Sequence, residues 1–160
     1  MIYLLIIFVI SFISVQIYRY YDLKKQSTIL SIKESIMLTD FPILTFTSKG
    51  RKIKLLLDTG SNRNIIDENL LSELDVTGTS SDDTTIHSMG GKSKLSSKVI
   101  LSFKYDSLDF KDSFLAADIS GNIAAIKELS GVEVNGILGT PFMTKYKYII
   151  DLDNLKVRIK

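Results

Sequence analysis

The sequence predicts an all-β, barrel-like domain that carries two short helices. The first observation is that most of the chain after residue 40 divides into short segments in which apolar and polar residues alternate. The second is that clusters of turn-forming residues separate these segments. The third is that only two stretches between them have helical character. Many short strands with few helices indicate a barrel-like fold.

Each predicted strand is a short apolar or alternating run bounded by a turn. The strands are residues 41–47, 51–57, 64–67, the two arms around Gly90-Gly91, 99–103, 108–117, 146–151 and 155–159. We expect residues 48–50 to turn the first two strands into a hairpin, and Asp153-Asn154 to do the same for the last two.

Two helices and a loop lie between these strands. Asp67 can cap a helix over residues 68–74, and Asn122 can cap one over residues 123–129. Residues 77–83 are rich in Ser, Thr and Asp, so they are predicted as a loop.

The N-terminus has a different character from the rest of the chain. Residues 2–17 are almost wholly apolar, and a helix of this length reaches about 24–27 Å, close to the roughly 30 Å hydrocarbon core of a bilayer. Tyrosines and basic residues follow, as in an interfacial belt. The 160 residues therefore divide into a single transmembrane anchor at 1–21, a connector at 22–40 and one domain at 41–160. Within the connector, residues 27–38 fit either a short helix or an entering strand.

Three alternatives compete for the apolar segment. A cleaved signal peptide needs a charged start and a small-residue cleavage site, and the sequence has neither. A core helix that is apolar on all faces would be unusual at the terminus of a small domain. A lipoprotein anchor needs a cysteine, which the chain lacks. A single-pass membrane anchor is the best interpretation.

The charges support the same division. The chain has 20 Lys and Arg against 18 Asp and Glu, and Arg19, Lys24 and Lys25 against Asp22 account for the whole net charge of +2. The remaining domain is balanced, so it offers no electrostatic footprint for nucleic acid. The basic flank after the apolar run favours a cytoplasmic domain. The lack of cysteine excludes disulfides and thiol catalysis.

The most informative motif is Asp58-Thr59-Gly60-Ser61, which follows the apolar run 55–57. A buried strand that ends in Asp-Thr-Gly delivers a carboxylate, a hydroxyl and a glycine into a tight loop. Two further motifs follow it along the chain. Residues 87–92 fit a glycine-tipped hairpin, and residues 135–142 contain two apolar residues followed by a glycine.

Together these three motifs resemble the retropepsin-like family, the retroviral-type aspartic proteases and their cellular and bacterial relatives. The resemblance covers residues 41–160, and with the anchor it indicates a membrane-anchored, bacterial-type member. It implies the closed β-barrel acid protease (retropepsin) fold, preceded here by the transmembrane helix. It also implies an aspartic endopeptidase that needs no cofactor and binds extended peptide or protein segments.

Peptide hydrolysis by this class uses two aspartates that share a proton and hold a water between them. The sequence provides one convincing candidate, Asp58. Asp118 has one residue too many before its glycine and lies too close along the chain for a second lobe, so it is interpreted as a strand end and turn. The remaining solution is a homodimer in which each subunit contributes Asp58.

The resemblance assigns roles to the rest of the loop. Thr59 would hydrogen-bond across the dimer axis, Gly60 would keep side-chain bulk away from the substrate, and Ser61 would lie beside the substrate backbone. Asn62 and Arg63 depart from the commonest retroviral pattern, which has an acidic residue just after this point. Their presence leaves the substrate specificity open.

Two other elements complete the expected site. Met89, Gly90 and Gly91 would form a flap over the substrate, or else an ordinary exposed hairpin. Ile137, Leu138 and Gly139 would support the aspartate loop and also form a core strand. Pro141 fits the first turn of a short helix after Thr140. The lone His87 is interpreted as a surface residue, and no set of residues matches a metal site.

Two rival interpretations remain. A membrane-anchored peptide-binding or dimerisation module could keep the fold without cleaving anything, although the intact Asp58-Thr59-Gly60 argues against it because a buried like-charge pair is costly. Alternatively, a small β-domain resembles the family by chance, and failure to dimerise would favour that interpretation.

Overall fold

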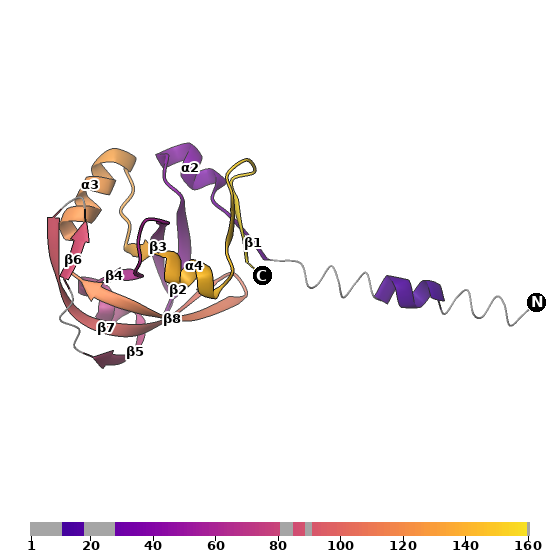
Figure 1. Ribbon diagram of the computed structural model, residues 1–160, viewed down its shortest axis with the longest axis horizontal. Coiled ribbons are helices and arrows are strands. Elements are labelled where there is room, and N and C mark those ends of the chain that lie inside the picture. The colour runs from indigo at the N-terminus through magenta and orange to yellow at the C-terminus, as the bar shows by residue number, and fades with distance from the viewer. Residues whose placement is uncertain (1–10, 18–27, 81–84, 89–90, 160) are drawn as a thin grey trace, which may run out of the picture.

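The computed structural model describes residues 11–17, 28–80, 85–88 and 91–159. From residue 28 onward these form strands with a few short helices (Figure 1). In chain order the elements are β1 (Thr28–Ser31), α2 (Lys33–Thr39), β2 (Ile43–Ser48), β3 (Arg51–Leu57), β4 (Ile65–Asp67), the 3-10 helix η1 (Glu68–Glu73), β5 (Asp75–Ser80), β6 (Thr85–Ser88), β7 (Gly91–Tyr105), β8 (Leu108–Ala117), α3 (Ser120–Ser130), β9 (Gly136–Leu138), α4 (Thr140–Lys145), β10 (Ile149–Asp151) and β11 (Lys156–Ile159).

Six strands close into a ring. They are hydrogen-bonded in the order β2-β3-β9-β4-β8-β7, and Thr47 of β2 pairs with Lys104 of β7 to complete the circuit. The side-chain hydroxyl of Ser48 strengthens this seam by donating to the carbonyl of Ser102 at 2.7 Å. The predicted closed β-barrel is confirmed, and the ring gives the domain its core.

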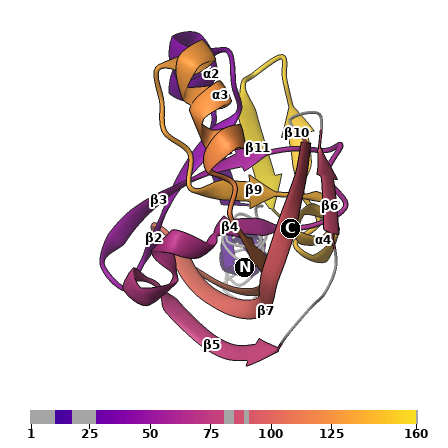
Figure 2. The ribbon, with the colours of Figure 1, turned by 90° about the vertical axis from the view of Figure 1, so that its left-hand side faces the viewer.

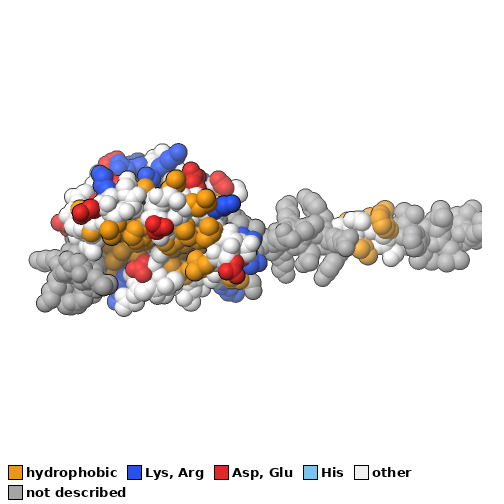
Figure 3. Space-filling view, turned by 90° about the horizontal axis from the view of Figure 1, so that it is seen from above, with side chains coloured by type: hydrophobic (Ala, Val, Ile, Leu, Met, Phe, Trp, Pro, Cys, Tyr) orange, Lys and Arg blue, Asp and Glu red, His pale blue; other side chains and the backbone are white. Residues whose placement is uncertain are grey.

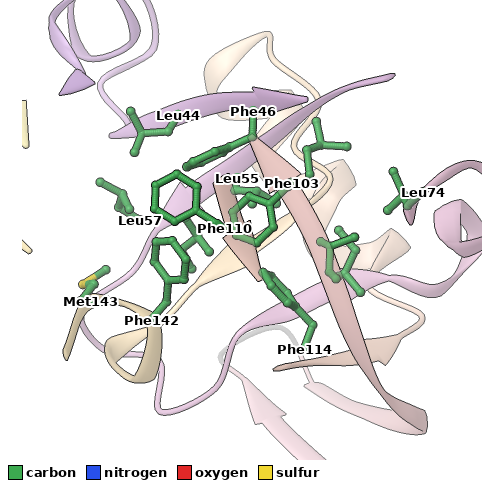
Figure 4. Close-up of a cluster of buried hydrophobic side chains, with 14 of the residues drawn as sticks. Leu44, Phe46, Leu55, Leu57, Leu74, Phe103, Phe110, Phe114, Phe142 and Met143 are labelled. Carbon is green, nitrogen blue, oxygen red and sulfur yellow. The ribbon is translucent and has the colours of Figure 1, made fainter. Parts of the chain in front are cut away.

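The interior of the barrel is filled by aromatic rings (Figure 4). Over residues 44–48 of β2 and 52–57 of β3, buried residues alternate with exposed or half-buried ones, as the sequence pattern predicts. Phe46 lies edge-to-face with Phe103 at a centroid distance of 5.1 Å, and Phe103 also contacts Phe110, Phe114 and Phe142. Since Phe142 belongs to α4, this cluster attaches that helix to the barrel.

Strand β7 extends beyond the ring and carries two further strands. Its first residues pair with β6, with Ser88 opposite Gly91, so the two arms of the predicted hairpin are present. Its central residues pair with β5. Figure 2 shows β5 and β6 along different parts of the long, curved β7. The expected short strand at 99–103 is therefore the middle of a much longer one.

A second, three-stranded sheet lies beside the barrel. Strand β11 is its centre, flanked by β1 on one edge and β10 on the other. Val157 and Ile159 of β11 are buried in the same core as the barrel residues. The predicted hairpin at the end of the domain is thus confirmed as β10 and β11.

Residues 27–38, which fit either a helix or a strand, provide both: β1 and then α2.

The predicted loop at 77–83 is wrong over its described part. Residues 75–80 form β5, an edge strand of the sheet with a bulge between Thr77 and Thr79 where Gly78 has a φ of 71°. Polar residues suit this strand because Thr77 and Gly78 face solvent. Residues 81–83 lie outside the described residues.

The helix predictions hold with one correction. Asp67 caps η1 as predicted, because its side chain accepts a hydrogen bond from the N–H of Asn69. Helix α3 begins at Ser120, before the predicted cap Asn122, so that cap is wrong. Pro141 lies in the first turn of α4, as expected. With α2, and with α4 as the short helix expected after Thr140, the described residues have more helices than the two named in the predicted fold class.

The surface also exposes apolar side chains. Figure 3 shows a band of them across the face that lies uppermost in Figure 1. Met37 and Leu38 of α2 are 70% and 73% exposed, and Leu129 of α3 is 76% exposed. Contiguous apolar surface of this kind is where proteins contact partners.

The predicted membrane anchor falls largely outside the described residues. Residues 11–17 are helical and exposed. Within the part of the chain that the structure describes, no helix has both the length and the apolar character needed to cross a bilayer.

Candidate active site

The site is organised by β9, a short strand inserted between β3 and β4. It runs parallel to β3, with Leu57 opposite Leu138, and antiparallel to β4, with Ile65 opposite Ile137. Residues 58–64 connect β3 to β4, so they must cross the end of β9. The predicted carboxylate loop is therefore tied to the predicted apolar-apolar-glycine element by strand pairing.

Asp58 lies directly after β3 and is half-buried. Its N–H donates to the carbonyl of Leu138 at 3.0 Å, which continues the pairing with β9. Its Oδ1 accepts a hydrogen bond from the N–H of Gly60 at 2.8 Å, and its carbonyl accepts one from Ser61 at 3.2 Å. The turn thus holds the carboxylate in one orientation while leaving it accessible.

The rest of the loop is fastened to the start of α4. The N–H and the hydroxyl of Thr140 both donate to the carbonyl of Ser61, at 2.9 and 3.1 Å. The hydroxyl of Ser61 in turn donates to the carbonyl of Arg63 at 2.7 Å. Ser61, predicted to lie beside the substrate backbone, therefore also has a structural part in the loop.

A buried amide completes the support. The side chain of Asn64 is 4% exposed. Its Oδ1 accepts from the N–H of Gly139 at 3.1 Å, and its Nδ2 donates to the carbonyl of Ser113 at 3.1 Å. One side chain therefore joins the loop, β8 and the end of β9, and satisfies backbone groups that would otherwise be buried without partners.

Two glycines allow the chains to approach this closely. A Cβ on Gly139 would overlap the carbonyl oxygens of Arg63 and Ser61, and a Cβ on Gly136 would overlap the carbonyl of Ile65. Only the absence of a side chain permits either contact. The predicted supporting role of Gly139 has this physical basis.

A second amide fixes the start of β9. The Oδ1 of Asn135 accepts from the N–H of Lys54 at 2.8 Å, and its N–H donates to the carbonyl of Lys54 at 2.7 Å. Reasoning from sequence missed Asn64, Asn135 and Gly136 as site residues. Asn64 could have been noticed as a polar residue beside the apolar pair Ile65-Ile66. Asn135-Gly136 gave no such indication, because it has the composition of an ordinary turn.

The structure brings together most of the predicted site residues. Thr59 and Gly60 are exposed on the loop next to Asp58, Leu138 and Gly139 are buried behind it, and Ile137 is half-buried. Of the predicted flap, Gly91 begins β7 opposite Ser88. Met89 and Gly90 lie outside the described residues. His87 belongs to β6.

Asp118 takes no part in this arrangement. It follows β8 directly, and its Oδ1 accepts a hydrogen bond from the N–H of Ser120 at 3.0 Å. Hydrogen bonds from Ser120 hold the pKa of Asp118 below its usual value. Its predicted role as a strand end is confirmed. Among the described residues, no group of three or more His, Asp or Glu is placed to hold a metal ion.

The arrangement presents one accessible carboxylate. Asp58 is the single carboxyl group in the loop of residues 58–64. A carboxylate in such a position can take a proton from water, so it can serve in acid–base chemistry.

Comparisons with known proteins found a family and similar solved structures. A family model described as aspartyl protease matches residues 44–142. The EIAV protease in complex with the inhibitor HBY-793 matches with a TM-score of 0.52 and 18% identity, over 70% of this chain and 93% of that one. The retroviral protease-like domain of Ddi1 from Leishmania major matches with a TM-score of 0.47 and 12% identity, over 74% and 88%.

No curated protein sequence matches the chain. The family match spans more than half of the sequence and includes the loop of residues 58–64, β9 and the start of α4. The barrel has the fold of the retroviral enzyme. The chain therefore belongs to the aspartyl protease family and has the retropepsin-like fold.

Proposed function

We propose that this protein is an aspartic endopeptidase that acts as a homodimer, with Asp58 of each subunit sharing one proton and activating one water. The observation that carries the proposal is the geometry of Asp58. Its carboxylate is oriented by the N–H of Gly60 on a loop that β9 and Asn64 hold in place, yet it remains accessible. Elaborate support around one carboxylate fits a catalytic role better than a structural one.

The proposed mechanism needs the two-fold partner. Two carboxylates about 3 Å apart cannot both ionise easily, so one is protonated and donates to the scissile carbonyl while the other takes a proton from water. Thr59 and Gly60 are exposed in the single chain, and they are the residues that would meet the partner's loop. The hairpin of β6 and β7 would cover the extended substrate.

We further propose that residues 1–21 anchor the enzyme in a membrane, with the domain in the cytoplasm. The apolar run followed by tyrosines and basic residues supports this part of the proposal. Confinement to a plane would raise the effective concentration of subunits, so that even weak self-association suffices for activity.

The test is cleavage of a diverse peptide library by the full chain in detergent micelles, with Asp58→Asn as the inactive comparison, between pH 4 and 8. We expect the parent to cleave, the variant to be silent, and the specific activity to rise with protein concentration. Equal cleavage by both would show that Asp58 is not the catalytic group. Peptide binding without cleavage by the parent would instead favour a non-catalytic binding module.

A further inference from the structure

Arg63 is an exposed cation on the same loop as Asp58. Its backbone is held tightly, because the hydroxyl of Ser61 donates to its carbonyl at 2.7 Å and accepts from its N–H at 3.3 Å. Its carbonyl also packs against Gly139, where a side chain would not fit. The backbone of Arg63 is therefore fixed in the loop, while the residue itself is exposed.

The guanidinium has no acidic partner among the residues that the structure describes. The ion pairs within the described residues involve other basic groups: Arg51, Lys104, Lys127, Lys145 and Arg158. Arg63 thus presents a permanent positive charge beside the carboxylate loop. A cation held at the edge of a binding site without a partner is available to an anionic group on whatever binds there.

We propose that Arg63 makes the enzyme prefer peptides with an acidic side chain close to the bond that is cleaved. This inference rests on the proposed protease function. Arg63 is five positions after Asp58, so their Cα atoms are at most about 18 Å apart, and the turn at Ser61 brings them closer. An extended substrate rises about 3.3 Å per residue. The acidic residue therefore lies within about five positions of the cleaved bond.

The two-fold symmetry of the proposed dimer adds a consequence. Each subunit contributes one Arg63, so the preference applies on both sides of the cleaved bond, at positions related by the dimer axis. The size of the effect is that of an exposed ion pair, about two- to fivefold in kcat/KM for each site. It should weaken as the salt concentration rises.

The experiment compares peptide pairs that differ only by Asp or Asn, with the substitution scanned over five positions on each side of a cleaved bond. The full chain in micelles is assayed at pH 6, where a peptide Asp is ionised. We expect the Asp peptide to be cleaved about two to five times faster at one position or at a symmetric pair. Arg63→Gln should abolish this ratio, and Arg63→Glu should reverse it, so that the Asn peptide is cleaved faster than the Asp peptide.

Lys52→Gln is the matched control. Lys52 is also exposed and outside the ion pairs named above, but it lies near the beginning of β3, at the opposite end of that strand from Asp58. Its loss should leave the Asp-to-Asn ratio unchanged. If the Asp-to-Asn ratio fell by a similar amount in Lys52→Gln and Arg63→Gln, the preference would come from the overall charge of the protein. That result would overturn the assignment to Arg63.

Two outcomes separate this inference from the proposed function. Cleavage with no Asp preference, or with a preference that survives in Arg63→Gln, overturns the role of Arg63 and leaves the protease assignment intact. If the parent cleaves no peptide, the proposed function fails. The affinities of the parent for fluorescently labelled Asp and Asn peptides, measured by fluorescence anisotropy, then decide the inference. Equal affinities for the two peptides would overturn it.

Discussion

Asn64 and Gly139 are joined by a 3.1 Å hydrogen bond across 75 residues of sequence, from the N–H of the glycine to the buried side-chain oxygen of the asparagine. The bond connects the end of the aspartate loop to the residue that follows β9. Because Asn64 also donates to Ser113 on β8, three parts of the barrel depend on one side chain.

Replacement of Asn64 by Leu should therefore destabilise the protein and impair the site together. The change leaves the N–H of Gly139 and the carbonyl of Ser113 buried without partners, which costs about 1–3 kcal/mol of unfolding free energy. Urea unfolding followed by circular dichroism measures the loss. Asn62→Leu, at an exposed position of the same loop, should change stability by less than about 0.5 kcal/mol. Equal effects of the two changes would contradict the support assigned to Asn64.

Gly139→Ala should be severe despite its small size. The added methyl group would overlap the carbonyls of Arg63 and Ser61, so β9 or the aspartate loop must shift, at a cost of about 1–3 kcal/mol or more. The rate of peptide cleavage should fall by more than the loss of unfolding free energy alone would cause, because the shift is transmitted to Asp58. Gly121→Ala in α3 is the matched control, since a Cβ there meets open space. It should be neutral or stabilise by up to about 1 kcal/mol.

Thr59 offers a test of the dimer. If its hydroxyl bonds across the axis, Thr59→Ala removes a symmetric pair of hydrogen bonds, about 1–3 kcal/mol in total, and raises the dimer dissociation constant roughly 5- to 150-fold. Sedimentation over a concentration series gives this constant. Thr59→Ser should restore most of the affinity, whereas Thr45→Ala, exposed on the outer face of β2, should have no effect. An unchanged constant in Thr59→Ala would exclude the bond.

The turn between β10 and β11 should respond to acid. Asp151 accepts hydrogen bonds from the N–H and the Nδ2 of Asn154, each at 3.0 Å, and these bonds, with smaller effects of Lys156 and Arg158, hold its pKa below the usual 3.8. A lowered pKa means that the ionised carboxylate favours the folded state. This contribution is complete above pH 3.8 and is lost as the pH falls through the lower, folded-state pKa.

Thermal unfolding between pH 6 and pH 2 measures this contribution. Asp151→Asn should be less stable than the parent near neutral pH, and the difference should shrink as the pH falls. Asp153→Asn, an exposed change in the same turn, should give only a small difference in stability near neutral pH. A constant difference for Asp151→Asn would mean that the carboxylate charge has no part in the turn.

The sequence predicted those features that are local. Asp58-Thr59-Gly60, the hairpin of β2 and β3, and the cap at Asp67 each depend on residues a few positions apart, so their patterns could be recognised. The roles of Asn64 and Asn135 depend on Gly139 and Lys54, which are distant in sequence, and no local pattern reports such bonds.

Strand β5 was missed because its local sequence pattern is misleading. Its composition is that of a loop, and only its place against β7 makes it a strand, because an edge strand with a solvent-facing side tolerates polar residues. The start of α3 was also misplaced. The helix begins at Ser120 after the N-cap residue Ile119, whose side chain makes no capping hydrogen bond, so no capping residue marks this start in the sequence.

The position of β11 between β1 and β10 has a consequence for biosynthesis. Thr28 pairs with Ile159, so β1 finds its partner only after almost the whole domain has been translated. At about 5–20 residues per second, this leaves the strand next to the N-terminal segment unpaired for roughly ten seconds. Strand β9 also emerges long after Asp58. A nascent chain that has not yet reached β9 therefore lacks the strand that holds the aspartate loop in place.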